Sequence, residues 1–169
     1  MKTLWTPWRM ESIIAGQAED GGKKVPCPFE PPGTSSDSKA DLLLYRDADR
    51  ICLLNRFPYA NGHLLLAPCR HVADLADLSP AERAGLMELV NSAAAILKRT
   101  LKPDGFNIGI NLGIDAGAGI PEHLHIHVVP RWRGDHNYLT VLAEIRTIPE
   151  HIEATFDRLL PHFRDLAAA

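Results

Sequence analysis

Imidazole and aliphatic side chains alternate strictly over residues 123–129, where the sequence reads HLHIHVV. Successive side chains of a β-strand point to opposite faces of a sheet, so this period of two predicts a strand. The aliphatic members would pack into a core: Leu124, Ile126 and Val128. The imidazoles would form a row on the other face, roughly 6–7 Å apart along the strand: His123, His125 and His127.

A row of imidazoles needs a chemical reason, because a buried ring nitrogen must find a hydrogen bond that Val or Thr would not require. Neutral histidine is a common metal ligand, so the row could bind a metal. Alternatively, one imidazole could be a nucleophile that the others orient. A histidine-rich exposed strand is a third interpretation. The flanks argue against it, since a glycine-rich loop precedes the row and Pro130-Arg131-Trp132 follows it.

The pattern His-φ-His-φ-His-φ-φ, with φ aliphatic, resembles the signature of the histidine-triad (HIT) nucleotide-binding proteins and fills every position of it. The resemblance covers about residues 41–132. Both ends are also similar to the bacterial diadenosine tetraphosphate phosphorylase, or ATP adenylyltransferase-like, branch, through Leu4–Met10 (LWTPWRM) and Pro130–Asp135 (PRWRGD). The resemblance implies an α+β HIT-like fold and a homodimer.

The resemblance also implies the catalytic residues. His125 would attack the α-phosphorus of a nucleotide and form a covalent nucleotidyl-histidine, which splits one hard displacement into two easier ones. His123, His127 and His63 would support it. His63 ends the segment Asn55–His63 (NRFPYANGH), which matches the family's Asn…Gly-His spacing.

Nucleotide contacts follow from the same resemblance. Asn55 would bind the ribose, and Asn111 falls where relatives place a polar nucleotide contact. The loop Gly117-Ala118-Gly119 would offer backbone N–H groups to phosphate oxygens, because glycine permits close approach. Many members carry Gln or Ser in this loop, so its Ala-Gly pair disfavours a fragile-histidine-triad hydrolase and favours the phosphorylase branch. Trp132 would either stack on a base or pack on the sheet.

A second constellation concerns metal. Some relatives bind zinc through Cys-x-x-Cys near the N-terminus, a His after the third strand and the first triad histidine. The matching positions here are Cys27, Glu30, His71 and His123, with Glu in place of the second Cys. Carboxylate can ligate Zn²⁺, so the resemblance allows a structural zinc ion. No cofactor is expected for the chemistry itself.

Composition sets outer limits. The chain has 169 residues, 46% hydrophobic and 23% charged, which suits a globular protein. No run approaches the roughly 18 apolar residues of a membrane span, and the N-terminus lacks an apolar signal core. Three cysteines without a framework spacing indicate a reduced, cytoplasmic setting. A net charge of −3 argues against nucleic acid as the main partner.

The element order predicts an α+β fold, with an antiparallel sheet of about five strands, a central helix and a C-terminal helix. Strands are predicted at residues 41–45, 50–55, 63–67, 106–111 and 123–129. A capping box, Ser79-Pro80-Ala81-Glu82, starts a helix that runs to about Arg99. Thr147 to Glu150 repeats the pattern before a helix to about Leu160. Residues 1–40 would be an N-terminal arm and flexible loop, and residues 41–169 the HIT domain.

Four functions remain open. The resemblance implies phosphorolysis of diadenosine tetraphosphate to ATP and ADP, with inorganic phosphate as second nucleophile. Hydrolysis of dinucleoside polyphosphates or nucleoside phosphoramidates is the close alternative. A metal-dependent hydrolase would use the three triad histidines as catalytic ligands. A non-catalytic nucleotide-binding module would bind ATP, ADP or AMP without turnover.

Overall fold

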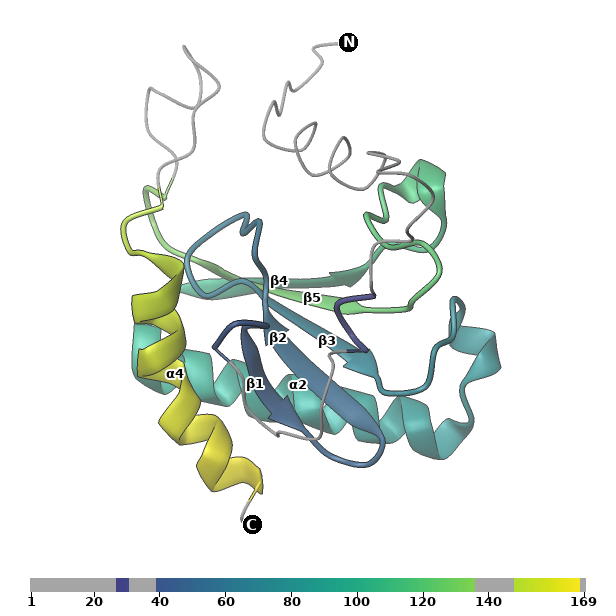
Figure 1. Cartoon of the computed structure of the whole chain (residues 1–169). Coiled ribbons are helices and arrows are strands. Elements are labelled where there is room, and N and C mark those ends of the chain that lie inside the picture. The colour runs from purple at the N-terminus through teal and green to yellow at the C-terminus, as the bar shows by residue number, and fades with distance from the viewer. Residues whose placement is uncertain (1–26, 31–38, 136–147, 168–169) are drawn as a thin grey trace, which may run out of the picture.

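The computed structural model describes residues 27–30, 39–135 and 148–167. The predicted arm, most of the predicted flexible loop and Thr147 lie outside these residues. The described strands form one antiparallel sheet in the order β1-β2-β3-β5-β4, as Figure 1 shows. The strands are β1 (Leu43–Arg46), β2 (Arg50–Leu54), β3 (Leu64–Pro68), β4 (Gly105–Ile110) and β5 (Ile126–Arg131). The predicted α+β architecture is confirmed.

The alternation of imidazole and aliphatic residues sorts side chains between the two faces of the sheet. Leu64 pairs with Val128 and Leu65 with His127 across β3 and β5, and paired residues share a face. Val128 belongs to the main core, whereas Leu65 belongs to a smaller cluster on the other face. The strand itself is shorter than predicted, since β5 begins at Ile126 and His123 precedes it.

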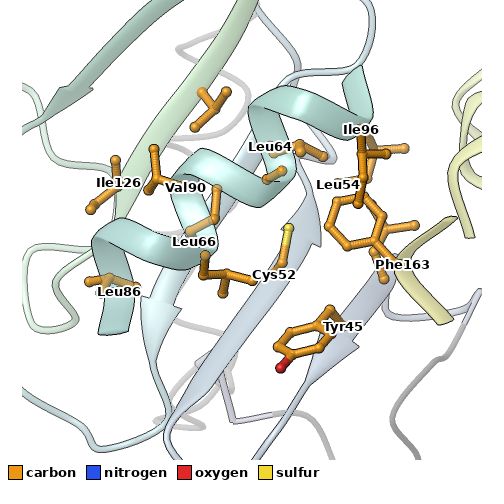
Figure 2. Packing of buried hydrophobic residues seen from close by; sticks show 14 of the residues in the cluster. Tyr45, Cys52, Leu54, Leu64, Leu66, Leu86, Val90, Ile96, Ile126 and Phe163 are labelled. Atoms are coloured by element: carbon orange, nitrogen blue, oxygen red, sulfur yellow. The ribbon is translucent and has the colours of Figure 1, made fainter. Parts of the chain in front are cut away.

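Helix α2 (Pro80–Leu101) covers the main core. Its predicted capping box is present, because the Ser79 hydroxyl accepts from the Glu82 N–H and the Glu82 carboxylate accepts from the Ser79 N–H. Figure 2 shows the packing of this helix on the strands. The buried face of α2 has the helical spacing of its apolar residues: Leu86, Leu89, Val90, Ala93, Ile96 and Leu97.

Helix α4 (Ile152–Ala167) differs from the prediction at both ends. It begins at Ile152, after the predicted capping-box segment that ends at Glu150. The Glu150 carboxylate accepts from the Thr155 hydroxyl and the Asn61 amide. The helix also continues past Leu160, although Pro161 lacks the N–H that a helix interior uses. Leu159 and Phe163, both 0% exposed, lie one turn apart on either side of this proline. Their burial offsets the missing hydrogen bond. No helix among the described residues combines the length and the apolar character that a membrane span requires.

A second hydrophobic cluster lies on the face of the sheet that carries the histidines. Its buried members come from β1, β2, β3 and the segment Cys27–Glu30, the short purple stretch in Figure 1: Phe29, Leu43, Ile51, Leu53, Leu65 and Ala67. Phe29 is 0% exposed, so this part of the predicted flexible loop is packed against the sheet.

Candidate active site

His125 is held in one orientation by the backbone just before it. Its Nδ1 lies 2.8 Å from the carbonyl oxygen of His123, and a carbonyl only accepts, so this nitrogen donates its hydrogen. The neutral ring therefore carries a lone pair on Nε2, which a nucleophile needs. Burial lowers the pKa of His125, although the hydrogen bond to the His123 carbonyl opposes the shift. The imidazole is therefore neutral near neutral pH.

His63 and His127 form a hydrogen-bonded pair beside His125. Two donors point at Nδ1 of His63, the backbone N–H of Tyr59 and the side-chain amide of Asn55, each at 3.1 Å. The hydrogen of neutral His63 therefore sits on Nε2, which donates to Nδ1 of His127 at 3.0 Å. Neutral His127 then carries its own hydrogen on Nε2. The rings of His127 and His125 lie 4.9 Å apart at 64°, so the two imidazoles are side by side.

The His63 ring is buried away from solvent, and an aromatic ring lies beside the pair. His63 is 0% exposed, and burial first, then the neighbouring His127 and His125, lower its pKa to about 3. The Tyr59 ring lies 4.7 Å from the His63 ring and 5.9 Å from that of His127. The sequence reasoning missed Tyr59, whose one signal was an aromatic residue in the turn before His63.

Asn55, the predicted ribose ligand, is brought to this pair. Its Oδ1 accepts the backbone N–H of Phe57 at 3.0 Å, which fixes the carboxamide so that Nδ2 faces His63. One hydrogen of Nδ2 is left for a ligand. Ribose binding therefore stays a prediction for Asn55, which lies beside the His63–His127 pair.

Phe29 is a second residue that the sequence reasoning missed. Its ring centroid lies 4.9 Å from that of His123 and 5.3 Å from that of His125. It covers one side of the His125 ring and restricts the approach of water from there. Its sequence signal was only its place two residues after Cys27, inside a segment of loop-like composition.

Three of the four predicted metal ligands gather at the other end of the row. One ligand atom each from Cys27, His71 and His123 lies within 4.8 Å of the others. The Nε2–H of His123 donates to the Pro68 carbonyl at 2.8 Å, so Nδ1 keeps its lone pair and faces Cys27 Sγ at 3.3 Å. Glu30 stands outside this group of atoms, with its carboxylate 3.0 Å from Nδ1 of His71.

The glycine loop lies beside the second cluster, which Ile120 joins. The N–H of Gly117 donates to the Ile114 carbonyl at 2.8 Å, and that of Ala118 to the Gly113 carbonyl at 3.4 Å, a long contact. A Cβ at Gly119 would meet nothing within 4 Å, so packing does not demand glycine there. Phosphate binding by this loop stays a prediction, with Gly119 and Ala118 as its most available amides.

Two further predicted residues lie farther from the histidines. Asn111 donates from its side chain to the Gly117 carbonyl at 3.5 Å, which ties it to the loop rather than to the triad. Trp132 follows β5, about 16 Å along the strand from His127 at the usual rise per residue. Base stacking by Trp132 stays a prediction.

The chain resembles known proteins in both sequence and structure. Residues 37–134 match the model of the HIT domain, which is more than half of the chain. The chain is 36% identical to an AP-4-A phosphorylase of Mycobacterium tuberculosis over 159 residues, which cover 92% of this chain and 80% of that protein. It is 34% identical over 93 residues to a bis(5'-nucleosyl)-tetraphosphatase (asymmetrical) of Schizosaccharomyces pombe, covering 55% of this chain and 50% of that protein.

Solved structures agree with the sequence match. A Zn-bound histidine triad family protein from Mycobacterium smegmatis superposes with a TM-score of 0.60 at 30% identity, covering 75% of this chain and 86% of that one. A histidine triad nucleotide-binding protein from Sulfolobus tokodaii gives a TM-score of 0.61 at 25% identity, with 74% and 85% covered. The chain is therefore an enzyme of the HIT family.

Proposed function

We propose that the chain catalyses nucleotidyl transfer on dinucleoside polyphosphates, and that its reaction is phosphorolysis of diadenosine tetraphosphate to ATP and ADP. The orientation of His125 carries the proposal, because a carbonyl holds Nδ1 as the donor and leaves the lone pair on Nε2. Similarity to the AP-4-A phosphorylase over 92% of the chain supports this substrate and phosphate as acceptor.

The reaction proceeds in two displacements at one phosphorus. Nε2 of His125 forms a bond to the α-phosphorus of one adenylyl group, and the bond to the bridging oxygen breaks, releasing ATP. Charge that develops on the ring is shared through the hydrogen bond to the His123 carbonyl. A phosphate oxygen then attacks the same phosphorus, the bond to Nε2 breaks, and ADP leaves with His125 restored.

The His63–His127 pair supports the phosphoryl group. His127 offers an N–H from Nε2 because His63 donates to its Nδ1. Such a preorganised donor stabilises negative charge on a phosphoryl oxygen more strongly in a buried site than in water. Asn55 fixes the arrangement at its far end and would contact the ribose.

Hydrolysis is the second candidate, with water in place of phosphate. The similarity to the tetraphosphatase of Schizosaccharomyces pombe favours it, although that match covers a smaller share of this chain. The geometry disfavours a catalytic metal held by the triad. Of the three triad histidines only His123 belongs to the metal-binding group found among the described residues, where its partners are Cys27 and His71.

We also propose that Cys27, His71 and His123 hold a structural Zn²⁺ ion. Thiolate and imidazole are the donors that zinc prefers, and the hydrogen bond from His71 to Glu30 is the usual support for a ligating imidazole. When bound, zinc ties the Cys27–Glu30 segment to the sheet. Metal analysis of the purified chain tests this, with Cys27→Ser expected to lower the zinc content.

A homodimer completes the proposal. Strand β4 is at one edge of the sheet, and Ile108 on it is 49% exposed. Pairing of two such edges would extend the sheet across a twofold axis. Sedimentation would give a dimer mass for the wild type and a monomer mass for Ile108→Lys.

All three cysteines are free thiols, which supports a reduced, cytoplasmic setting.

Product analysis tests the function. The chain is incubated with diadenosine tetraphosphate, with and without inorganic phosphate, and the nucleotides are separated. ATP plus ADP that appear only with phosphate support phosphorolysis, whereas ATP plus AMP without phosphate identify hydrolysis. The absence of products in both samples would overturn this substrate and favour a phosphoramidate or a module that binds without turnover.

A further inference from the structure

The segment Cys27–Glu30 connects the metal cluster to the nucleophile. It closes into a turn, since the N–H of Glu30 donates to the carbonyl of Cys27 at 3.0 Å. Both ends of the turn reach the cluster, Cys27 through its contact with Nδ1 of His123 and Glu30 through Nδ1 of His71. Phe29 lies between these ends and contacts the rings of His123 and His125.

A second connection runs through His123 itself. Its ring supplies a ligand atom of the cluster, and its backbone carbonyl accepts the Nδ1–H of His125 at 2.8 Å. Whatever fixes the side chain of His123 also fixes the residue whose carbonyl orients the nucleophile. The metal cluster and the reacting nitrogen are thus joined both through the backbone and through an aromatic contact.

We propose that a divalent cation at Cys27, His71 and His123 holds Phe29 against His125, so that Phe29 is a positioning residue and cation occupancy sets the exposure and activity of the nucleophile. The inference rests on the proposed function, in which His125 is the reacting group. It goes beyond a structural tie, because it links the loading of the cluster to the catalytic step.

The relative strength of the contacts supports this role. Among the described residues, the side-chain contacts at the ends of the turn without a cation are one thiol–imidazole contact and the Glu30–His71 pair, whose side chains are 51% and 46% exposed. A pair exposed to this degree contributes little to stability. Ligation of zinc by thiolate and imidazole is far stronger. The opposing contribution is the burial of Phe29 in the second cluster, which needs no cation.

Chemical modification separates these two contributions. The full chain is saturated with Zn²⁺ or stripped with a chelator, and both samples are treated briefly with diethyl pyrocarbonate, which acylates accessible imidazoles. Peptide mass spectrometry then reports modification at His125 alone, which the cation does not touch. We expect severalfold faster modification of His125 in the stripped sample and recovery of protection when Zn²⁺ is added back. Turnover of diadenosine tetraphosphate should fall and recover in parallel.

Variants assign the effect to Phe29. In Phe29→Leu loaded with Zn²⁺, the zinc content should equal that of the wild type while His125 is modified faster, and Phe29→Ala should increase this effect. Cys27→Ser should lose both zinc and protection. Cys69→Ser is the matched control, because Cys69 is a half-buried thiol outside the metal cluster. This variant should keep its zinc and the protection of His125. Circular dichroism confirms that each variant is folded.

The outcomes are distinct. Equal modification of His125 in loaded and stripped wild type would overturn the inference, because burial alone would then hold Phe29. Protection that persists in zinc-loaded Phe29→Ala would overturn the role of Phe29. A chain that binds no Zn²⁺ would overturn the coupling altogether. Zinc-dependent protection without any turnover would support the coupling and instead reject the proposed function.

Discussion

The two ends of the histidine row are held by different kinds of contact. At one end, the nitrogens of His123 face a carbonyl and a thiol, and His71 faces a carboxylate. At the other end, His63 and His127 hold each other, and the donors that fix them are a backbone N–H and an amide. The first set places lone pairs where the proposed cation would bind, whereas the second places a hydrogen on Nε2 of His127, where it would face the proposed phosphate.

His125 lies between these two environments and depends on both. Its tautomer comes from the carbonyl of His123, and its neighbour on the other side is the His127 ring. The partners of each ring nitrogen thus give an alternating row of identical side chains three different hydrogen-bonding environments, which match the three roles proposed above. Substitutions at the two ends should therefore affect different properties, turnover at one end and zinc binding at the other.

The largest effect is expected at the centre of the row. His125→Asn keeps a side-chain amide that can donate to the His123 carbonyl but removes the reacting nitrogen. Turnover of diadenosine tetraphosphate should fall roughly 10⁴-fold or more, as when a covalent nucleophile is removed. Steady-state kinetics with saturating phosphate measure this, and zinc content should stay at the wild-type level. Full turnover in the variant would rule out covalent catalysis by His125.

Substitution at the end of the row formed by His63 and His127 should reduce turnover less than substitution of His125. His63→Asn removes the imidazole that donates to Nδ1 of His127, so the tautomer of His127 is no longer fixed. We expect kcat to fall about 10²-fold, within the range for lost proton-donor catalysis, with little change in bound zinc. A variant that loses zinc instead would show that the two ends are not independent.

The same variant tests the acid stability of this end. The pKa of His63 is about 3 in the folded chain against 6.5 for an unperturbed histidine. Between these two pH values, His63 binds a proton in the unfolded state but not in the folded state. The free energy of unfolding therefore decreases as pH falls through this window, by on the order of a few kcal/mol. The groups that face His63 are His127, His125 and Tyr59. Denaturant titrations across this range should give a shallower pH dependence for His63→Asn.

Local patterns in the sequence predicted the parts of this comparison that depend on neighbours in the chain. The period of two placed Ile126 and Val128 in the core, and the capping box placed the start of α2. The predicted end of α4 near Leu160 was too early, because the burial of Phe163, which favours continuation past Pro161, is a tertiary effect.

Local patterns could not predict the contacts between distant residues, and the resemblance alone grouped His63 and the four metal-ligand candidates with the triad. Phe29 contacts His125 although strands β1 to β4 lie between them in the sequence, and no periodicity marks it. The resemblance named Glu30 as a ligand, whereas its hydrogen bond to His71 arises only when the loop folds onto the sheet. The triad could be recognised because it is local, whereas Phe29 and Tyr59 beside it could not.

The backbone that positions His63 gives the next test. Gly62 has φ of +73°, and a Cβ there would lie 2.4 Å from Cδ1 of Leu101. Gly62→Ala should lower the free energy of unfolding by roughly 1–2 kcal/mol from the backbone conformation alone, with further loss from the clash. Thermal denaturation measures this. Gly105→Ala is the control, since a Cβ there meets nothing within 4 Å, and an equal loss in both variants would contradict the role of the turn.

The smallest effect is expected at Glu30, which contacts His71 at the end of the row where the proposed zinc ion would bind. If its carboxylate only orients His71 by accepting from Nδ1, Glu30→Gln should weaken Zn²⁺ binding about 10-fold to 100-fold and leave kcat unchanged at saturating zinc. If Glu30 is instead a fourth ligand, loss of its charge should weaken binding well beyond that range and release zinc on dialysis. Competition with a fluorescent chelator measures the affinity, and Glu88→Gln, an exposed carboxylate on α2, controls for the change in net charge. An unchanged affinity would mean that the Glu30–His71 contact supports neither role, so that Cys27, His71 and His123 hold the ion without it.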